Sequence, residues 1–185
     1  MAGTKGTSLV NIVKLLRANK EAARREVPAR LQSYLETRVV LLAWYPEEDF
    51  LELARALARI LPSGGPAPWE WMGRESARRD LAEVYRPLLR PGDPLGTLAK
   101  GALLWSAYHD SGRFRALPDA PGSARLELAD FGLPAVETCE IFRGYFAEVL
   151  RAAGARSVEV TQIACRTQGA QSCLWQAKWE PPEPA

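Results

Sequence analysis

The stretch CRTQGAQSC, residues 165–173, places two cysteines eight positions apart around a glycine in the C-terminal part of the chain. Residues 157–164 before it and residues 172–179 at its end both alternate between apolar and polar side chains, which is the pattern of half-buried strands. Gly169 lies between the two runs and can adopt the positive φ that a tight loop needs. The stretch therefore predicts a β-hairpin with a cysteine at each end of its loop.

A long helix is predicted immediately before this hairpin, over residues 133–153. Pro134 would stand in its first turn and Gly154 just past its end, where these residue types are favoured. In front of the helix, residues 124–129 (ARLELA) alternate again and predict a further strand. The C-terminal third is thus expected to be strand, long helix and closing hairpin.

The N-terminal part of the chain has the periodicity of helices. Three acidic residues at 47–49 precede an apolar stripe with helical spacing, so a helix is expected to begin there. The apolar run at 39–45 fits a buried strand or a buried helix end, and periodicity does not separate the two. The predicted fold class is α+β, with an N-terminal helical half, about residues 8–110, packed on a C-terminal antiparallel sheet with one long helix and a closing β-hairpin.

The length of 185 residues is that of one domain. We expect a single ligand-sensing-like domain over residues 1–180, whose sheet-containing half spans about 113–180, and a disordered tail at 181–185. No apolar stretch approaches the length of a membrane span and no signal peptide is recognised, so we expect a cytoplasmic protein without membrane insertion. The formal net charge of +2 gives no reason to expect nucleic acid as a partner.

The three cysteines form the clearest chemical signal. Cys165 and Cys173 stand at the two ends of the hairpin loop, and Cys139 lies on the apolar stripe of the preceding helix. In a reducing compartment thiols stay free or bind metal, and three soft ligands from two elements suit zinc. Because cysteine is also among the most frequently buried residue types, a buried cluster without metal is the alternative.

The sequence does not indicate a catalytic site. His109 is the only histidine, and it falls at the end of a predicted helix, where an imidazole usually caps the helix or lies at the surface. No phosphate loop, dinucleotide fingerprint or His-Glu-x-x-His motif occurs. Since no acid–base pair and no nucleophile with a base can be named from spacing, the chain is predicted not to be an enzyme.

Six tryptophans are many for a chain of this length. Tryptophans usually fill a core, but they can also line a pocket for an apolar small molecule. For a pocket between the helices and the sheet, Trp105 and Tyr108 are the residues that we expect to line it and to contact an apolar or aromatic ligand.

The C-terminal third resembles a known superfamily. Residues 124–131 (ARLELADF), the helix that carries Cys139 and the hairpin at 165–173 are similar to a ligand-sensing superfamily with 4-vinyl-reductase domains and the sensor domains of aromatic-responsive transcription activators. Vesicle-tethering subunits, which act through protein contacts, share its fold. The resemblance implies an α+β sensor or binding domain.

The resemblance also implies a metal. In the phenol-type sensors of this superfamily, a cysteine on this helix and two cysteines around this loop bind a structural zinc, with one further ligand just before the loop. Cys139, Cys165 and Cys173 match three of these positions. The fourth falls on Gln162, which departs from the pattern because a neutral amide is a poor zinc ligand.

Over its whole length the chain resembles an uncharacterised bacterial family of about this size. The resemblance is carried, beside the hairpin, by KGT at residues 5–7, WYP at 44–46 and YHDSG at 108–112. The related haem nitric-oxide sensors use a proximal histidine and a Tyr-x-Ser-x-Arg motif. Tyr108, Ser111 and Arg113 do not have that spacing, so no haem is expected.

The predicted function is therefore that of a non-enzymatic sensory or small-molecule-binding domain that acts through a protein partner. The alternative is a protein–protein interaction or scaffold module with no small ligand and a purely structural cysteine cluster. In either case a homodimer, formed through the helical half, is expected.

Overall fold

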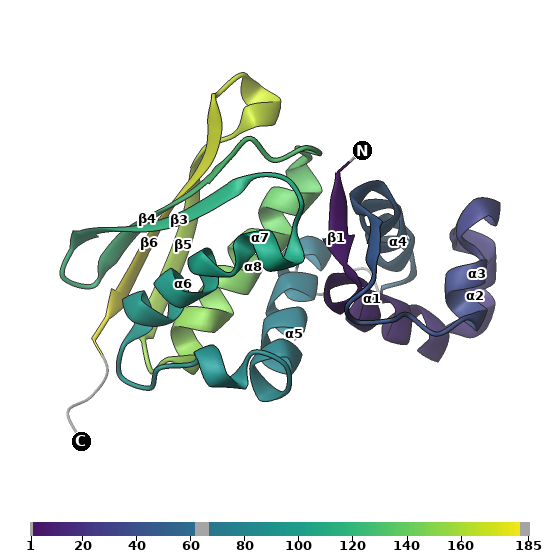
Figure 1. Cartoon of the computed structure of the whole chain (residues 1–185), viewed down its shortest axis with the longest axis horizontal. Coiled ribbons are helices and arrows are strands. Elements are labelled where there is room, and N and C mark those ends of the chain that lie inside the picture. The colour runs from purple at the N-terminus through teal and green to yellow at the C-terminus, as the bar shows by residue number, and fades with distance from the viewer. Residues whose placement is uncertain (1, 62–66, 182–185) are drawn as a thin grey trace.

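The computed structural model describes residues 2–61 and 67–181, in which a group of helices stands beside a four-stranded sheet with further helices (Figure 1). The N-terminal part contains β1 (Gly3–Lys5), α1 (Gly6–Ala18), α2 (Lys20–Glu26), η1 (Ala29–Leu31), α3 (Ser33–Glu36), β2 (Trp44–Pro46) and α4 (Glu47–Ile60). The remainder contains α5 (Pro68–Ala82), η2 (Arg86–Leu88), α6 (Pro94–Leu103), α7 (Trp105–Tyr108), β3 (Arg113–Ala120), β4 (Ser123–Ala129), α8 (Val136–Ala152), β5 (Arg156–Ala164), η3 (Arg166–Gln168) and β6 (Ser172–Glu180). Residues 182–185 of the predicted tail lie outside the described residues.

The main sheet is antiparallel with the strand order β3-β4-β6-β5. Its inward face comes from the alternation seen in the sequence: in the β4–β6 pair Leu126 lies opposite Trp175 and Leu128 opposite Cys173, and all four side chains are buried. The predicted α+β class and the closing hairpin are confirmed. In the hairpin loop η3 is followed by Gly169, whose φ of 90° is in the left-handed region that favours glycine.

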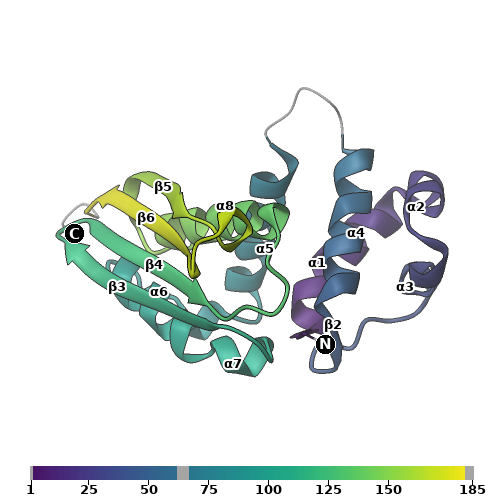
Figure 2. The same ribbon diagram turned by 90° about the horizontal axis from the view of Figure 1, so that it is seen from above.

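Helix α8 packs against the sheet, and α5 lies between α8 and the N-terminal helices (Figure 2). Helix α8 begins at Val136, three residues later than predicted, so Pro134 precedes the helix instead of standing in its first turn. Its C-terminal end agrees with the prediction, because Gly154 follows with a φ of 98°. Cys139 faces inward, as its place on the apolar stripe predicted.

Helices α5 and α8 cross with their backbones in contact, at two glycines. A Cβ atom added to Gly73 would overlap the carbonyl oxygen of Ile141, and one added to Gly144 would overlap the carbonyl oxygen of Glu70. No other residue type permits so close an approach without displacement of one helix. The crossing joins the two halves of the molecule, because it lies where their hydrophobic cores meet.

The structure has two clusters of buried apolar side chains, one centred on α1–α4, which is called the helical half from here on, and one centred on α5–β6, which is called the sheet half. The helical half buries the inward faces of α1 and α4, with a cluster that includes Leu9, Ile12, Leu16, Leu53 and Leu57. The sheet half buries the inner faces of β4 and β6 against α8, with further members from α5 and α6. Two residues of the crossing helices, Met72 and Ile141, belong to the helical cluster, so the cores are contiguous.

The apolar run at 39–45 is buried only at its first residue, Val39, and not over its length as predicted. The side chains of Val40 and Leu42 are 54% and 73% exposed, and only the end of the run forms a strand, β2, which pairs with β1. The main chain explains the difference, because the N–H groups of Gly6 and Thr7 donate to carbonyl oxygens of this run. The segment therefore completes the backbone hydrogen bonding at the start of α1, while its side chains between Val39 and Tyr45 are mostly exposed.

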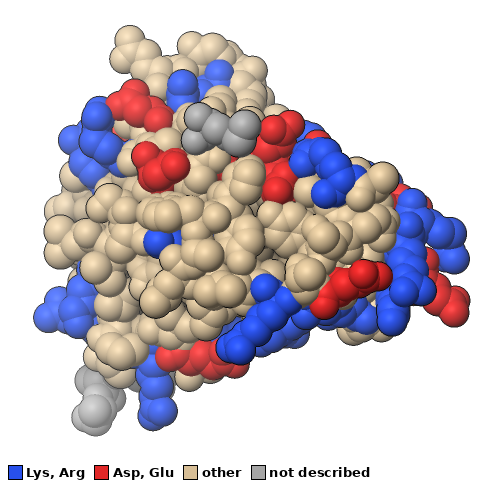
Figure 3. Space-filling model, turned by 45° about the vertical axis from the view of Figure 1, so that its right-hand side comes forward, with Lys and Arg blue, Asp and Glu red and all other residues tan. Residues whose placement is uncertain are grey.

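The surface charges are interleaved. On the face seen in Figure 3, Lys and Arg side chains lie beside Asp and Glu side chains, and the basic stretch of the N-terminal helices takes part in such pairs. Arg30 contacts both Asp49 and Glu52, and Arg59 contacts Glu26. Within the described ranges, no helix combines the length and apolar character needed to cross a bilayer.

Candidate functional site

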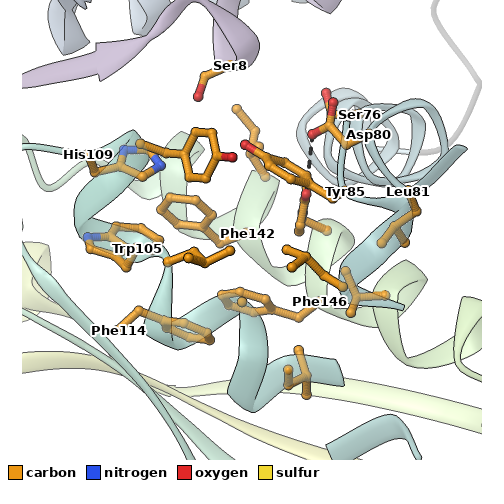
Figure 4. Close-up of a pocket in the computed structure, with 18 of the residues that line it drawn as sticks. Ser8, Ser76, Asp80, Leu81, Tyr85, Trp105, His109, Phe114, Phe142 and Phe146 are labelled. Atoms are coloured by element: carbon orange, nitrogen blue, oxygen red, sulfur yellow. Dashed lines mark hydrogen bonds between the residues drawn. The ribbon is translucent and has the colours of Figure 1, made fainter. Parts of the chain in front are cut away.

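A cavity of about 160 Å³ lies between the crossing pair α5 and α8 on one side and α6 and α7 on the other (Figure 4). Its walls are made by residues of these helices, completed by Phe114 from β3, Ser8 from α1 and Glu47 and Phe50 from α4. It is therefore built by segments from both halves of the chain.

Aromatic rings form the wall nearest the sheet. Phe114 stacks on Phe146 with ring centroids 4.8 Å apart, and Phe146 stacks on Phe142 at 5.9 Å. Trp105 closes the row, with its ring centroid 5.5 Å from that of Phe142. Because these rings pack on each other, they form a preformed apolar surface that a ligand would not have to order.

Polar groups gather at the end of the cavity next to β1 and α1, where Figure 4 shows Asp80, Ser76, Ser8 and His109. The carboxylate of Asp80 accepts hydrogen bonds from Asn11 Nδ2 at 3.1 Å and from the Tyr145 hydroxyl at 3.2 Å. Burial raises the pKa of Asp80 to about 7, although the hydrogen bonds from Tyr145 and Asn11 act in the opposite direction.

His109 also lines the cavity. Its ring stacks on Trp105 with centroids 4.2 Å apart, and its Nδ1 lies 3.4 Å from Glu47 Oε2. His109 is the C-cap residue of α7, as its place at a helix end predicted, but its side chain is only 12% exposed, so it is not a surface group. Some of the contacts that bury it come from β1 and α4, which are distant in the sequence: His109 forms an isolated bridge with Thr4 and lies beside Glu47.

The two residues predicted to line a pocket do lie in this wall. Trp105 donates from its indole N–H to the carbonyl oxygen of Ser111 at 3.0 Å, which fixes its ring. Tyr108 meets Tyr85 edge to face, with centroids 4.9 Å apart. That Trp105 and Tyr108 contact a ligand stays a prediction.

The three cysteines come together beside the N-terminal end of α8, and none of them lines the cavity. Cys139 Sγ lies 3.4 Å from Cys173 Sγ and 3.9 Å from Cys165 Sγ, and all three side chains are buried. A hydrogen bond between Cys139 and Cys173 lowers the pKa of Cys173 to about 6 and raises the pKa of Cys139, and the backbone N–H of Arg166 also favours the Cys173 thiolate. The sulfur atoms lie within 4.8 Å of one another.

This donor set contains three groups. Among the described His, Cys, Asp and Glu side chains, none joins the three sulfurs as a fourth donor. Gln162, at the position where the resemblance implied a ligand, instead donates a hydrogen bond from its side-chain Nε2 to the carbonyl oxygen of Ala164 at 3.2 Å. Three neighbouring thiols can bind a soft metal ion and can equally be a packed thiol cluster. That Cys139, Cys165 and Cys173 hold a metal stays a prediction.

Comparison with known proteins places the fold. No family model matches the sequence, and no curated protein matches it significantly. A variant of Tt H-NOX superimposes with a TM-score of 0.69 at 13% identity, over 98% of this chain and 97% of that one. An oxygen-binding H-NOX domain related to soluble guanylate cyclases, in its oxygen complex, gives 0.66 at 14% identity, over 98% and 97%. The chain has the H-NOX fold.

A third neighbour is an H-NOX protein from S. oneidensis in the Fe(II)NO ligation state, with a TM-score of 0.64 at 12% identity over 95% of this chain and 99% of that one. The expectation that no haem is bound is contradicted by these neighbours. It rested on the spacing of Tyr108, Ser111 and Arg113, and a chain without that spacing has the fold of the haem domains. The superfamily part of the sequence-based resemblance agrees with this fold, whereas the neighbours give no support to zinc.

The cavity fits a haem in part. His109 faces it and would hold the iron, and the stacked rings suit a flat macrocycle. Its volume of about 160 Å³ is smaller than the ~300–1,000 Å³ of typical small-molecule sites. None of the described lining residues is Lys or Arg, so nothing in the wall would pair with the carboxylates of a haem. A haem would need a wider cavity than the one described.

Several of these residues were not found by sequence reasoning. Asp80 stands in the charged run at 74–80, which has the composition of a solvated helix face, and Tyr145 stands in a helix already assigned to the core. Gly73 carried a usable signal, because a glycine inside a helical pattern often marks a close packing contact. No sequence pattern indicates the cavity itself, since it depends on how far apart α5 and α8 lie from α6 and α7 in the folded chain.

Proposed function

We propose that the chain is a sensory domain that binds one small apolar or aromatic molecule in the cavity between α5, α6, α7 and α8. The observation that carries this proposal is the cavity itself, which has stacked rings on one side and a few polar groups at one end. Sites that orient a small ligand have this composition. The H-NOX fold supports the proposal, because the neighbours include domains described in their ligand complexes.

The proposal includes action on a protein partner through the helical half, with a homodimer as the expected assembly. Contacts beside the cavity support it. The side chain of Asp110 accepts the N–H of Gly3 at 2.6 Å, and the Thr4 hydroxyl donates to the carbonyl oxygen of Tyr108 at 3.3 Å. A ligand that displaces α7 would thereby move β1 at the start of the helical half.

The test fills the cavity from Gly101. This glycine lines the cavity from α6, and a Cβ added to it meets no atom within 4 Å. We expect the wild type to bind one equivalent of 2-phenylethanol, a neutral aromatic probe, in a calorimetric titration. Gly101→Leu should weaken binding by about tenfold or more, because its side chain occupies the same space. Gly101→Ala is the matched control and should bind like the wild type.

A second variant covers the case in which Leu at position 101 turns away from the cavity. Leu98→Phe enlarges a side chain that is already buried in the wall. If both variants bind 2-phenylethanol as tightly as the wild type, the probe binds elsewhere and the cavity is not the site.

Haem is the second candidate occupant, favoured by the fold and by the only histidine of the chain facing the cavity. Bound haem supplies an iron that coordinates small gaseous ligands, and His109 would hold that iron. Titration with haemin should then give a 1:1 complex whose visible absorption changes in His109→Ala and is restored by added imidazole. Identical spectra for wild type and His109→Ala would remove His109 from this role.

The alternative function is an interaction or scaffold module without a small ligand, in which the cysteine cluster is purely structural. It is the outcome indicated if neither 2-phenylethanol nor haemin binds and light scattering gives a stable dimer. A monomer at high protein concentration would count against it.

A further inference from the structure

The charges in the cavity walls are mostly of one sign. Asp80 and Glu47 supply two carboxylates, and among the described lining residues the imidazole of His109 is the only basic group. That imidazole lies beside Glu47, with 3.4 Å between Nδ1 and Oε2. Glu47 therefore has a basic neighbour, and Asp80 is the carboxylate of the cavity that has none.

Asp80 is held in place by neutral donors. Asn11 from α1 and Tyr145 from α8 each donate one hydrogen bond to its carboxylate. No Lys, Arg or His nitrogen of the described residues forms an ion pair with it, whereas Arg74 and Arg78 of the same helix pair with Glu70 and Glu75. A partly buried carboxylate with hydrogen bonds but no counter-ion is costly to keep charged, and a cation placed beside it would remove that cost.

The backbone favours a cation at the same place. Asp80 stands in the last turn of α5, where the aligned peptide dipoles leave a partial negative charge. Its carbonyl oxygen accepts the N–H of Tyr85 at 2.7 Å, which folds the chain back so that the Tyr85 ring lies beside the carboxylate (Figure 4). An ammonium group there would meet a carboxylate and a helix C-terminus, and it would lie beside an aromatic ring, whose face attracts a cation.

We propose that the cavity is selective for small aromatic amines, bound with the ammonium group at Asp80 and the ring against Phe142, Phe146 and Trp105. This inference rests on the proposed function, because it names the class of ligand for the same cavity. The volume of about 160 Å³ admits a single ring with a short chain. An anionic ligand would meet Asp80 and Glu47 without a Lys or Arg to pair with, so carboxylates should be excluded.

The experiment compares three probes of matched shape by calorimetry at pH 8: 2-phenylethylamine, 2-phenylethanol and 3-phenylpropanoate. The amine should bind about tenfold or more tightly than the alcohol, because a hydrogen bond between charged groups is stronger than one to a neutral group. The carboxylate should bind most weakly. Asp80→Asn should reduce the affinity for the amine to that for the alcohol, while the affinity for the alcohol changes by no more than about twofold. Asp119→Asn, at an exposed position of β3, is the matched control and should change neither.

A pH series in the wild type keeps the inference testable if Asp80→Asn does not fold. Burial raises the pKa of Asp80 to about 7, so more of it is charged at pH 8 than at pH 6, and the affinity for the amine should rise over this range while that for the alcohol stays level. The groups that face Asp80 are Asn11, Tyr145, Tyr85 and Glu83. Because His109 and Glu47 face the same cavity, His109→Gln should show the same rise.

The outcomes separate the two proposals. If the alcohol or the carboxylate binds as tightly as the amine, or if Asp80→Asn weakens all three probes equally, the amine selectivity is wrong while the cavity remains a ligand site. If none of the three probes binds to the wild type, the proposed binding of small aromatic molecules fails together with this inference.

Discussion

The two halves of the molecule use the same kind of residue for different ends. In the helical half, Leu9, Leu53 and Leu57 are completely covered by side chains of neighbouring helices. In the sheet half, Leu98 and Phe146 are also shielded from solvent, but they face a cavity. In the helical half, covered apolar side chains supply stability. At the cavity wall, they supply a surface for another molecule. Burial alone therefore does not tell which role a side chain has, whereas packing does.

The largest expected effect tests this difference directly. Leu53→Ala should lower the free energy of unfolding by about 2–5 kcal/mol, because it opens a void in a filled core. Leu98→Ala is the matched change at the cavity wall and should cost less than Leu53→Ala, since part of the Leu98 side chain already lacks contacts. Urea unfolding of both variants measures the difference. Equal losses would show that the cavity wall is packed as tightly as the helical core.

The junction between the halves can be tested by adding a methyl group at Gly144. Gly144→Ala should destabilise the protein by about 1–3 kcal/mol, because its Cβ would overlap the backbone of α5 at Glu70. Gly101→Ala makes the same change in α6, where the new Cβ meets nothing within 4 Å, and should be neutral or stabilising by up to about 1 kcal/mol. A tolerated Gly144→Ala would mean that α5 and α8 can separate without loss.

A smaller effect comes from the polar end of the cavity. The pKa of Asp80 in the folded state is about 7, above its ordinary value of 3.8. Its contribution to stability is therefore complete below about pH 4 and is lost as the pH rises through 7, because the folded state disfavours the charge. Asp80→Asn should be more stable than the wild type at pH 8.5, by on the order of 1 kcal/mol, and equal to it or weaker near pH 4.

Thermal unfolding at the two pH values measures this difference, with Asp119→Asn, whose side chain is exposed, as the control. If Asp80→Asn and wild type change in parallel with pH, the carboxylate of Asp80 does not carry the burial cost inferred here.

Much of the fold could be predicted because it depends on local periodicity. The alternation of Leu126 and Leu128 identified an inward face of the sheet, and the spacing of Cys139 on a helical stripe placed it against the hairpin. The run at 39–45 was assigned to the interior because its side chains are apolar. Its actual place depends on hydrogen bonds from Gly6 and Thr7, which no local pattern contains.

The candidate site could be predicted only in part, because its parts come from distant segments. Trp105 and Tyr108 were named from residue type, and they lie in the cavity wall. His109 and Asp80 were not, because their surroundings are built by residues about 60 to 105 positions away, at Glu47 and Thr4 for the one and at Asn11 and Tyr145 for the other. The expectation that no haem is bound rested on the spacing of one motif, Tyr-x-Ser-x-Arg, and the fold does not depend on that motif.

The crossing at Gly73 and Gly144 has a consequence for how this domain can vary. The contact is made by backbone atoms and requires only that two side chains be absent. The residues on α6 and α7 that shape the opposite wall of the cavity take no part in it. Substitutions there can accumulate without disturbing the joint between the halves, so descendants of this sequence could acquire new ligands while keeping the same frame. Because the crossing depends only on glycine at positions 73 and 144, it places no constraint on the side chains of α6 and α7 that line the cavity.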